Sequence, residues 1–183
     1  MPGQTPPVGM ERKLVAIVHA DVQGYSRLLG EDELATLDVL TPYLAMMRTL
    51  VQQHGGRAVG SRGDSLLAEF PSVVAAVQCA VAMQHELKAR NAALPEARRV
   101  EFRMGVNLGE IVVDGEQLHG DGINIAVRLE GIARAGGICI SEVVYQQIKN
   151  KLALAYEDLG EQTLKNIAEP VRVWRIRLEG SES

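Results

Sequence analysis

Hydrophobic residues recur along this chain at two different spacings. Continuous runs of Val, Ile and Leu predict buried strands, and the first such run covers residues 13–20 (KLVAIVHA). Apolar residues three and four apart predict an amphipathic helix over residues 34–54. The residues that carry this helical spacing are Leu37, Leu40, Leu44, Met47 and Val51. The chain is therefore expected to alternate between strands and helices.

Turn residues divide the rest of the chain into further elements. Ser26 is expected to cap the helix that follows it, and Gly55-Gly56 to end that helix. The later expected elements are strands over 57–62 and 65–70 joined at Gly63-Asp64, a helix from Pro71 to Arg90, two strands within 100–113 broken at Gly109, a helix over 122–135, a strand over 137–141, a helix over 142–149, and strands over 156–163 and 171–178.

The order strand–helix–strand–strand–helix–strand is typical of a ferredoxin-like core. We therefore predict an α+β fold with a βαββαβ core and extra C-terminal strands. The expected boundaries are a disordered tail over residues 1–11, one domain over 12–178 and a short tail over 179–183. Since this fold hosts many functions, the function must be inferred from particular side chains.

Length and composition narrow the class of protein. The chain has 183 residues, which suits one domain, and a net charge of −4, which argues against a nucleic-acid binder because such proteins present a basic face. No stretch resembles a signal peptide or a membrane span of roughly 20 apolar residues. Cys79 and Cys139 lie in apolar runs and are interpreted as reduced core residues. We expect a cytoplasmic protein with no membrane association.

Two aspartates stand where predicted strands end or turn. Asp21 follows the first strand, Asp64 lies at the tip of a hairpin, and each has a glycine nearby. A ferredoxin-like core places that strand beside the hairpin, so both carboxylates could reach one point. Paired carboxylates with nearby carbonyl oxygens suit Mg²⁺. The alternative is that both are turn residues, because Asp tolerates tight turns.

A second pair of polar residues lies on a predicted helix. Asn124 and Arg128 are four positions apart and so share one face. An Asn and an Arg placed in this way could hold a ribose and a developing negative charge on phosphate. The alternative is an ordinary exposed polar face.

Taken together, these residues resemble the catalytic domain of class III nucleotidyl cyclases. Four motifs carry the resemblance in order over residues 12–178: HADVQGYS at 19–26, HGGRAVGSRGDSLLAEF at 54–70, HGDGINIAVRLEGIA at 119–133 and LKNIAEPVRVWRI at 164–176. The resemblance implies a homodimer with active sites between the subunits. It also implies a reaction of a nucleoside triphosphate to a 3′,5′-cyclic nucleotide and pyrophosphate with two Mg²⁺ or Mn²⁺ ions at each site.

The resemblance also assigns roles to individual residues. Asp21 and Asp64 match the metal-binding aspartates, and the carbonyl of Val22 matches a backbone ligand. Asn124 matches the residue that orients the ribose, and Arg128 the residue that stabilises the transition state. The residues expected to bind the triphosphate are Lys165 and the loop Gln23, Gly24, Tyr25 and Ser26, whose N–H groups stand at a helix start. With all these positions filled, an active enzyme is expected.

The residues expected to contact the base depart from the family. Adenylyl and guanylyl cyclases read the purine with side chains at positions that are Gly60 and Gln117 here. Arg62 is unexpected and should face the side that Gly60 leaves vacant, and His19 matches a wall of the base pocket. An Arg can donate to pyrimidine carbonyl oxygens, and Gln can donate and accept.

This pattern resembles the Pycsar pyrimidine cyclases of antiphage defence, which act without a regulatory domain and signal to a separate cyclic-nucleotide-sensing effector. UTP, yielding cyclic UMP, is the favoured substrate, with CTP close behind. The alternatives are an adenylyl cyclase making cyclic AMP and a catalytically silent dimeric domain that binds nucleotide. Arg62 facing solvent and His19 as a satisfied core residue are the ordinary interpretations of those two side chains.

Overall fold

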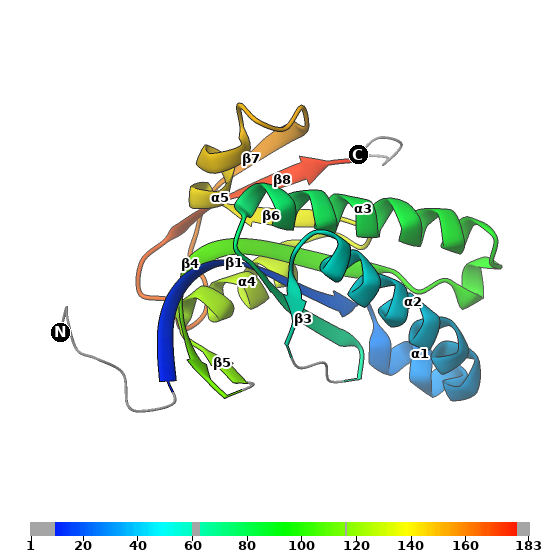
Figure 1. Ribbon diagram of the computed structural model, residues 1–183. Coiled ribbons are helices and arrows are strands. Elements are labelled where there is room, and N and C mark those ends of the chain that lie inside the picture. The colour runs from blue at the N-terminus through cyan, green and yellow to red at the C-terminus, as the bar shows by residue number, and fades with distance from the viewer. Residues whose placement is uncertain (1–9, 60–62, 116, 179–183) are drawn as a thin grey trace.

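A single eight-stranded sheet organises the computed structural model, which describes residues 10–59, 63–115 and 117–178 (Figure 1). The strands are β1 (Met10–Val22), β2 (Arg57–Ala58), β3 (Ser65–Phe70), β4 (Phe102–Asp114), β5 (Gln117–His119), β6 (Ile138–Ser141), β7 (Ala155–Gln162) and β8 (Val171–Arg177). Their order in the sheet is β2-β3-β1-β4-β6-β8-β7, and β5 pairs with β4.

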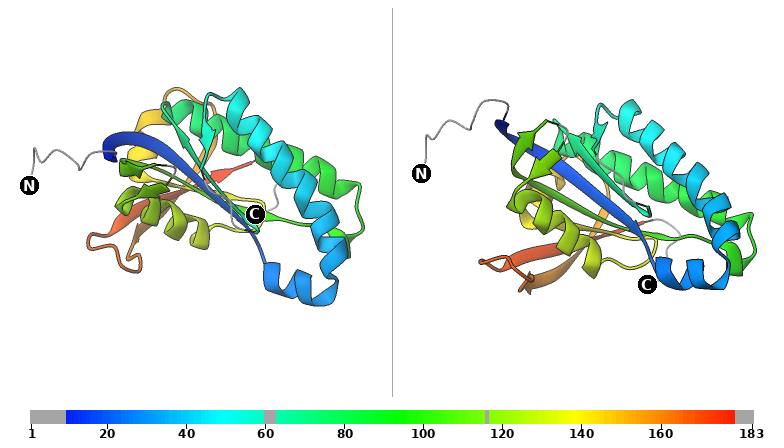
Figure 2. Two further views of the ribbon diagram at one scale, coloured as in Figure 1. Left: turned by 60° about the horizontal axis from the view of Figure 1, so that its bottom comes forward. Right: turned by 90° about the horizontal axis from the view of Figure 1, so that it is seen from below.

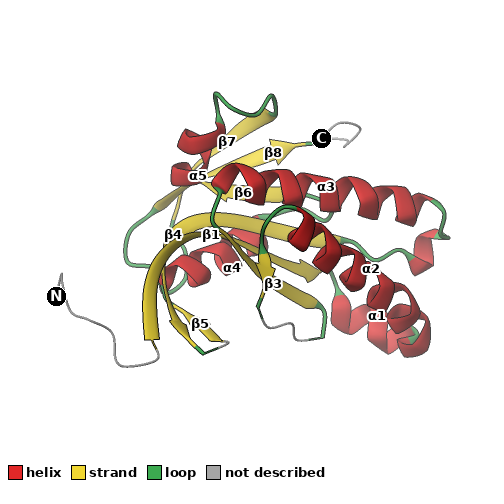
Figure 3. Ribbon diagram, in the orientation of Figure 1, coloured by secondary structure: helices red, strands yellow, loops and turns green. Residues whose placement is uncertain are grey.

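Helices cover both faces of this sheet (Figures 2 and 3). They are α1 (Tyr25–Glu31), α2 (Glu33–Gln53), α3 (Val73–Ala92), α4 (Asp121–Ile132) and α5 (Glu142–Ile148), with a short 3₁₀ turn at Glu96–Arg98. The helices α2, α3 and α5 lie on one face, and α4 lies on the other. This arrangement leaves α4 alone on its side of the sheet among the described helices.

The predicted α+β class is confirmed. Within the sheet, β4-β1-β3-β2 forms an antiparallel set with the strand order of a ferredoxin-like core. β6 extends this set by pairing parallel to β4, and β8 and β7 follow antiparallel. The extra C-terminal strands therefore continue the same sheet.

The alternation of β1 explains why both faces are covered. Ala16, Val18 and Ala20 belong to the large core under α2 and α3. Val15 and Ile17 belong to a smaller core against Ala126 of α4. Because successive side chains of a strand point to opposite faces, the continuous apolar run in β1 requires helices on both sides.

One described helix, α2, is long and apolar enough to span a membrane by length and composition. In this structure its apolar side packs inside the domain. The residues of α2 that are buried are Thr36, Leu40, Tyr43, Leu44, Met47 and Val51. Tyr43 also donates a hydrogen bond from Oη to Oδ1 of Asn91 in α3, at 2.7 Å. These contacts are those of an amphipathic helix that covers the core with one side.

Several element boundaries differ from the sequence-based prediction. Residues 10 and 11 belong to β1, and β2 is described only over two residues. The predicted break at Gly109 is wrong, because β4 runs through it and pairs Gly109 with Val15. That glycine instead admits α4, since a Cβ there would lie 3.0 Å from Cα of Gly122.

The predicted cap at Ser26 is also wrong. Ser26 lies inside α1, and the N-cap residue is Gly24, which adopts a left-handed conformation (φ 68°) and has no side chain to cap with. A separate helix, α2, then begins with Asp32 as its cap, whose carboxylate accepts from the N–H of Ala35 at 3.0 Å. Two helices therefore stand where one was expected.

Candidate active site

Asp21 and Asp64 lie at the same edge of the sheet. Asp21 is the penultimate residue of β1 and pairs across the sheet with Ser65, the first residue of β3. Asp64 directly precedes that residue, so it lies beside the end of β1. The turn before it contains Gly63, whose φ of 55° is left-handed. Strand register thus places two aspartates that are 43 positions apart in the sequence at neighbouring strand ends.

The loop between β1 and α1 adjoins this turn. A Cβ placed on Gly63 would lie 3.8 Å from Oη of Tyr25, so the tyrosine ring reaches the turn that carries Asp64. The N–H of Gln23 donates to the carbonyl of Glu101 at 2.8 Å, which ties the loop to the start of β4. Gln23, Gly24 and Ser26 are exposed.

A network of charged side chains surrounds Asp21. A terminal nitrogen of Arg103, on β4, lies 3.2 Å from Oδ1 of Asp21 and 3.2 Å from Oε2 of Glu130, on α4. The other oxygen of Glu130 lies 3.3 Å from Nδ1 of His19. The Glu130 side chain is only 3% exposed. Three elements therefore place two carboxylates and a guanidinium in one partly buried cluster.

The cluster shifts the pKa of each of its two carboxyl groups. Burial, together with the neighbouring Glu130, raises the pKa of Asp21 to about 7, although Arg103 acts in the opposite direction. Burial would also raise the pKa of Glu130, but its contacts with His19 and Asp21 and the charge of Arg103 lower it below the ordinary value. The two shifts run in opposite directions, so protonation near neutral pH is favoured at Asp21 rather than at Glu130, and a further cation at Asp21 would lower the pKa of Asp21.

The donor set at this edge fits Mg²⁺ or Mn²⁺ ions bound together with a phosphorylated substrate. The described residues contain no cluster of three or more His, Cys, Asp or Glu that could enclose a metal ion. The two aspartates and the carbonyl of Val22 would supply only some of the ligands of such ions. Mg²⁺ usually binds through one or two carboxylates and takes its remaining ligands from water and substrate phosphates.

Asn124 and Arg128 lie on the outer side of α4. Ala126, Leu129 and Glu130 are buried against the sheet, whereas Asn124 is exposed and Arg128 half-buried. Successive helical residues are rotated by about 100°, so Arg128 points about 200° away from Glu130. The helix therefore presents Asn124 and Arg128 on the side opposite the cluster that holds Asp21.

The backbone of Lys165 lies next to Arg128. Nε of Arg128 donates to the carbonyl oxygen of Lys165 at 3.2 Å. The Lys165 side chain is exposed, while the preceding Leu164 is buried and anchors the segment. Contact between α4 and the β7–β8 connection thus brings Arg128 to the backbone of Lys165.

The residues assigned to base recognition are only partly described. Gln117 is exposed at the start of β5, a short strand that was not expected. His19 is half-buried, shares the face of Asp21 and faces Glu130. Gly60 and Arg62 lie outside the described residues.

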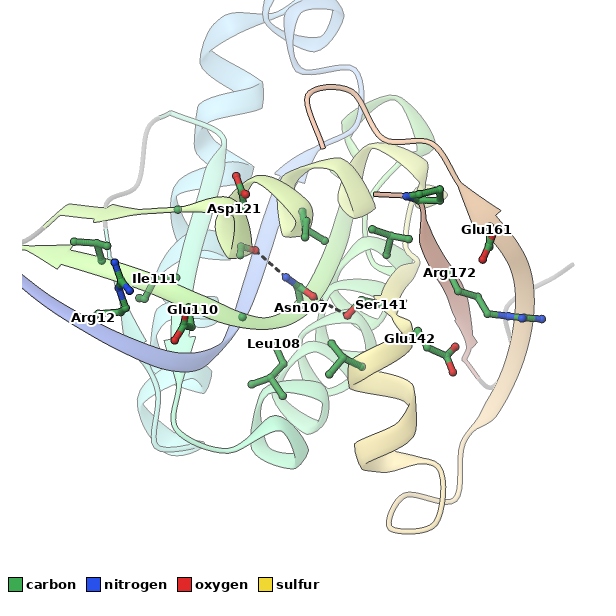
Figure 4. A pocket seen from close by; sticks show the side chains of 18 residues that line it. Arg12, Asn107, Leu108, Glu110, Ile111, Asp121, Ser141, Glu142, Glu161 and Arg172 are labelled. Atoms are coloured by element: carbon green, nitrogen blue, oxygen red, sulfur yellow. Dashed lines mark hydrogen bonds between the residues drawn. The ribbon is translucent and has the colours of Figure 1, made fainter. Parts of the chain in front are cut away.

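A separate cavity of about 840 Å³ opens between the middle of β4, the start of α4 and the end of β6 (Figure 4). Its inner wall contains Asn107, which donates to the carbonyl of Gly122 at 3.0 Å and accepts from Ser141 Oγ at 2.7 Å. None of the residues predicted for the active site lines it. The buried polar groups of this cavity are already paired with each other. We therefore take the strand ends that carry Asp21 and Asp64, called here the carboxylate edge, as the candidate site.

Arg103 and Glu130 were missed by the sequence-based prediction. A signal existed, since Arg103 interrupts an apolar strand and Glu130 falls four positions after Ala126 on the apolar side of α4. A charged residue on a buried face usually has a partner. The pattern could not show that both residues converge on Asp21.

Comparison with known proteins shows the family to which this domain belongs. A family model described as the adenylate and guanylate cyclase catalytic domain matches residues 9–177. The chain belongs to this family, and its domain is a class III nucleotide cyclase catalytic domain.

Relatives and solved structures resemble the chain along nearly all of its length. A protein of Rhizobium meliloti (strain 1021) named as a candidate adenylate cyclase 3 is 41% identical over 166 residues, which are 90% of this chain and 28% of that protein. Adenylate cyclase 1 of the same strain is 26% identical, over 90% of this chain and 28% of its own length. The chain thus spans under a third of these relatives.

Two solved structures align with this chain over nearly the full length of both proteins. An adenylate/guanylate cyclase/hydrolase from Silicibacter pomeroyi has 38% identity and a TM-score of 0.86, covering 91% of this chain and 98% of its own. The adenylyl cyclase CyaB from P. aeruginosa has 26% identity and a TM-score of 0.80, covering 92% and 95%.

Proposed function

We propose that this domain converts a nucleoside triphosphate into its 3′,5′-cyclic nucleotide and pyrophosphate, in a homodimer with two shared active sites. The observation that carries the proposal is the placement of the two residue sets. Asp21 and Asp64 lie at one edge of the sheet, and Asn124 and Arg128 point outward from the opposite side of α4. Two copies facing each other can bring one set from each copy around a single phosphate.

Each described residue then has a chemical task. Asp21, Asp64 and the carbonyl of Val22 would hold two Mg²⁺ or Mn²⁺ ions, which supply Lewis acidity at the ribose 3′-hydroxyl and neutralise phosphate charge. Arg128 of the facing copy would donate to the phosphate oxygens as negative charge develops, and Asn124 would orient the ribose. Lys165 and the loop Gln23–Ser26 would bind the triphosphate.

The position of Arg103 adds it to the residues proposed to bind the triphosphate. Its guanidinium lies beside Asp21 and is held by buried Glu130, so it presents positive charge where a metal-bound triphosphate would sit. Bound metal would replace Arg103 as the counter-charge of Asp21 and leave that guanidinium free to contact phosphate oxygens.

For the base, we propose a pyrimidine, with UTP ahead of CTP. The support is chemical: Gly60 has no side chain to contact a base, and Gln117 replaces the second purine-reading residue. The exposure of Gln117 on β5 leaves its amide free to donate and accept. The product would be cyclic UMP, sensed by a separate effector in the cytoplasm as part of a defence against phage.

ATP is the second candidate substrate. The names of the relatives in Rhizobium meliloti and of the CyaB structure refer to adenylate or adenylyl cyclases. This similarity supports cyclic AMP as the product, and only a direct comparison of substrates separates the two candidates.

The deciding experiment is incubation of the purified protein with ATP, GTP, CTP and UTP, each with Mg²⁺ or Mn²⁺, followed by mass analysis of the products. We expect cyclic UMP to form fastest. Cyclic AMP as the sole product would contradict the pyrimidine assignment but leave the cyclase reaction intact. The absence of every cyclic product would instead indicate a silent nucleotide-binding domain.

A further inference from the structure

The segment that carries Lys165 forms a tight turn with an unusual backbone. The N–H of Ile167 donates to the carbonyl of Leu164 at 3.1 Å, which closes a four-residue turn. Asn166 is the third residue of this turn and has a φ of 66°. Among the non-glycine residues that the structure describes, it alone has a positive φ. Lys165 does not share this feature, so the pair has the φ signs of a type II turn.

The type of turn decides where the carbonyl of Lys165 points. Types I and II differ by a rotation of about 180° in the peptide that joins the two central residues. In this structure that peptide is the one between Lys165 and Asn166, and its oxygen accepts from Nε of Arg128 at 3.2 Å. A type I turn would carry the same oxygen away from Arg128.

This hydrogen bond fixes one edge of the Arg128 guanidinium. An Arg has five N–H donors in a rigid plane, and engagement of Nε by a backbone carbonyl leaves the two terminal nitrogens to act together. Two parallel donors are the geometry that matches a phosphate group. The left-handed residue at 166 therefore controls, through one peptide group, the plane in which Arg128 is presented.

We propose that Asn166 is a positioning residue for catalysis, which holds the turn in the form that orients Arg128 and presents Lys165. The proposal rests on the proposed cyclase function for its catalytic consequence, but the backbone effect does not depend on it. Asn166 is exposed, so its role cannot come from packing in the core. Asn tolerates left-handed φ better than other residues with a Cβ, and Gly tolerates it without cost.

The test compares Asn166→Gly, Asn166→Ala and Asn166→Val. Glycine keeps the left-handed conformation and should retain wild-type kcat. Valine, which is β-branched, should favour the other turn and lower kcat by about 10- to 100-fold with little change in KM, because misplacing a transition-state group affects the chemical step most. The kcat of the alanine variant should lie between those of the glycine and valine variants.

A second measurement does not require activity. The Arg128 Nε–H signal in ¹H–¹⁵N NMR spectra, assigned by its loss in Arg128→Lys, should keep its shift and slow solvent exchange in the glycine variant and lose both in the valine variant. Wild-type protein without cyclase activity would overturn the proposed function, while this signal would still test the turn. Valine and glycine variants with equal kcat and equal Arg128 signals would overturn the positioning proposal.

Discussion

At the scale of single residues, substitution of the two aspartates at the carboxylate edge, Asp21 and Asp64, should have the largest effect on activity. Asp21→Ala and Asp64→Ala should each abolish formation of cyclic nucleotide, because the metal ions would lose a carboxylate ligand. Turnover is measured with the triphosphate that the wild type prefers. Asp38→Ala, an exposed position on α2, is the matched control and should keep full activity. Undiminished turnover in either active-site variant would contradict the assignment.

The two cysteines give a prediction about pH. Cys79 and Cys139 are fully buried and free, as the sequence pattern predicted, and burial raises the pKa of Cys79 to about 12 and that of Cys139 to about 11. Only the thiolate is a nucleophile, so at pH 8 both thiols should stay unreactive in the folded protein.

Reaction with a chromogenic disulfide reagent measures this directly. Native protein at pH 8 should release almost no colour, and the same sample in denaturant should release the equivalent of two thiols. Rapid release of colour by the native protein at pH 8 would show that a cysteine is accessible, contrary to its burial.

At the scale of elements, the docking of α4 on β4 depends on a glycine. A Cβ at Gly105 would lie 2.2 Å from the carbonyl oxygen of Ala126 and 2.5 Å from the N–H nitrogen of Glu130. Both atoms belong to the backbone of α4, so the helix itself would have to move. This contact sets the height at which α4 carries Asn124 and Arg128 above the sheet.

Gly105→Ala should therefore lower the free energy of unfolding by about 1–3 kcal/mol, the usual cost of overpacking a core. Gly131→Ala is the matched control, since it lies in α4 with nothing within 4 Å of the added Cβ. That change should stabilise the protein by up to about 1 kcal/mol, because alanine favours the helix. Urea unfolding measures both, and equal effects of the two variants would contradict the close approach.

At the scale of the whole molecule, one copy of the domain separates the groups that the proposed reaction would need together. Asp21 lies between the sheet and α4, and Arg128 lies on the far side of the same helix. The distance is built into the helix, since residues on opposite sides cannot converge without unwinding it. A shared site in the proposed symmetric dimer would bring the two sets together.

Mixing two inactive variants tests this arrangement. Asp21→Ala and Asn124→Ala proteins should each be inactive, and after mixing and exchange of subunits, heterodimers would hold one site free of both substitutions. Random pairing makes half of the dimers mixed with one good site each, so activity should recover to about a quarter of the wild type. No recovery, with subunit exchange confirmed independently, would contradict a shared site.

Local patterns predicted much of this structure and failed at identifiable points. The strand over β1, the helix over α3 and the α+β class follow from apolar spacing alone. Gly109 was misread as a break, because glycine looks the same in sequence whether it ends a strand or admits a helix. Ser26 was misread as a cap, because Gly24 begins the helix through its backbone conformation rather than through a side chain.

The sequence by itself determined the chemical groups and the family: two aspartates near glycines, an Asn and an Arg one helical turn apart, and four ordered motifs. Only the tertiary structure decided what these groups touch. Arg103 reaches Asp21 across 82 positions, and Arg128 reaches the carbonyl of Lys165 across 37. Strand register and helix docking create such contacts, and both are set by packing of the whole chain rather than by local spacing.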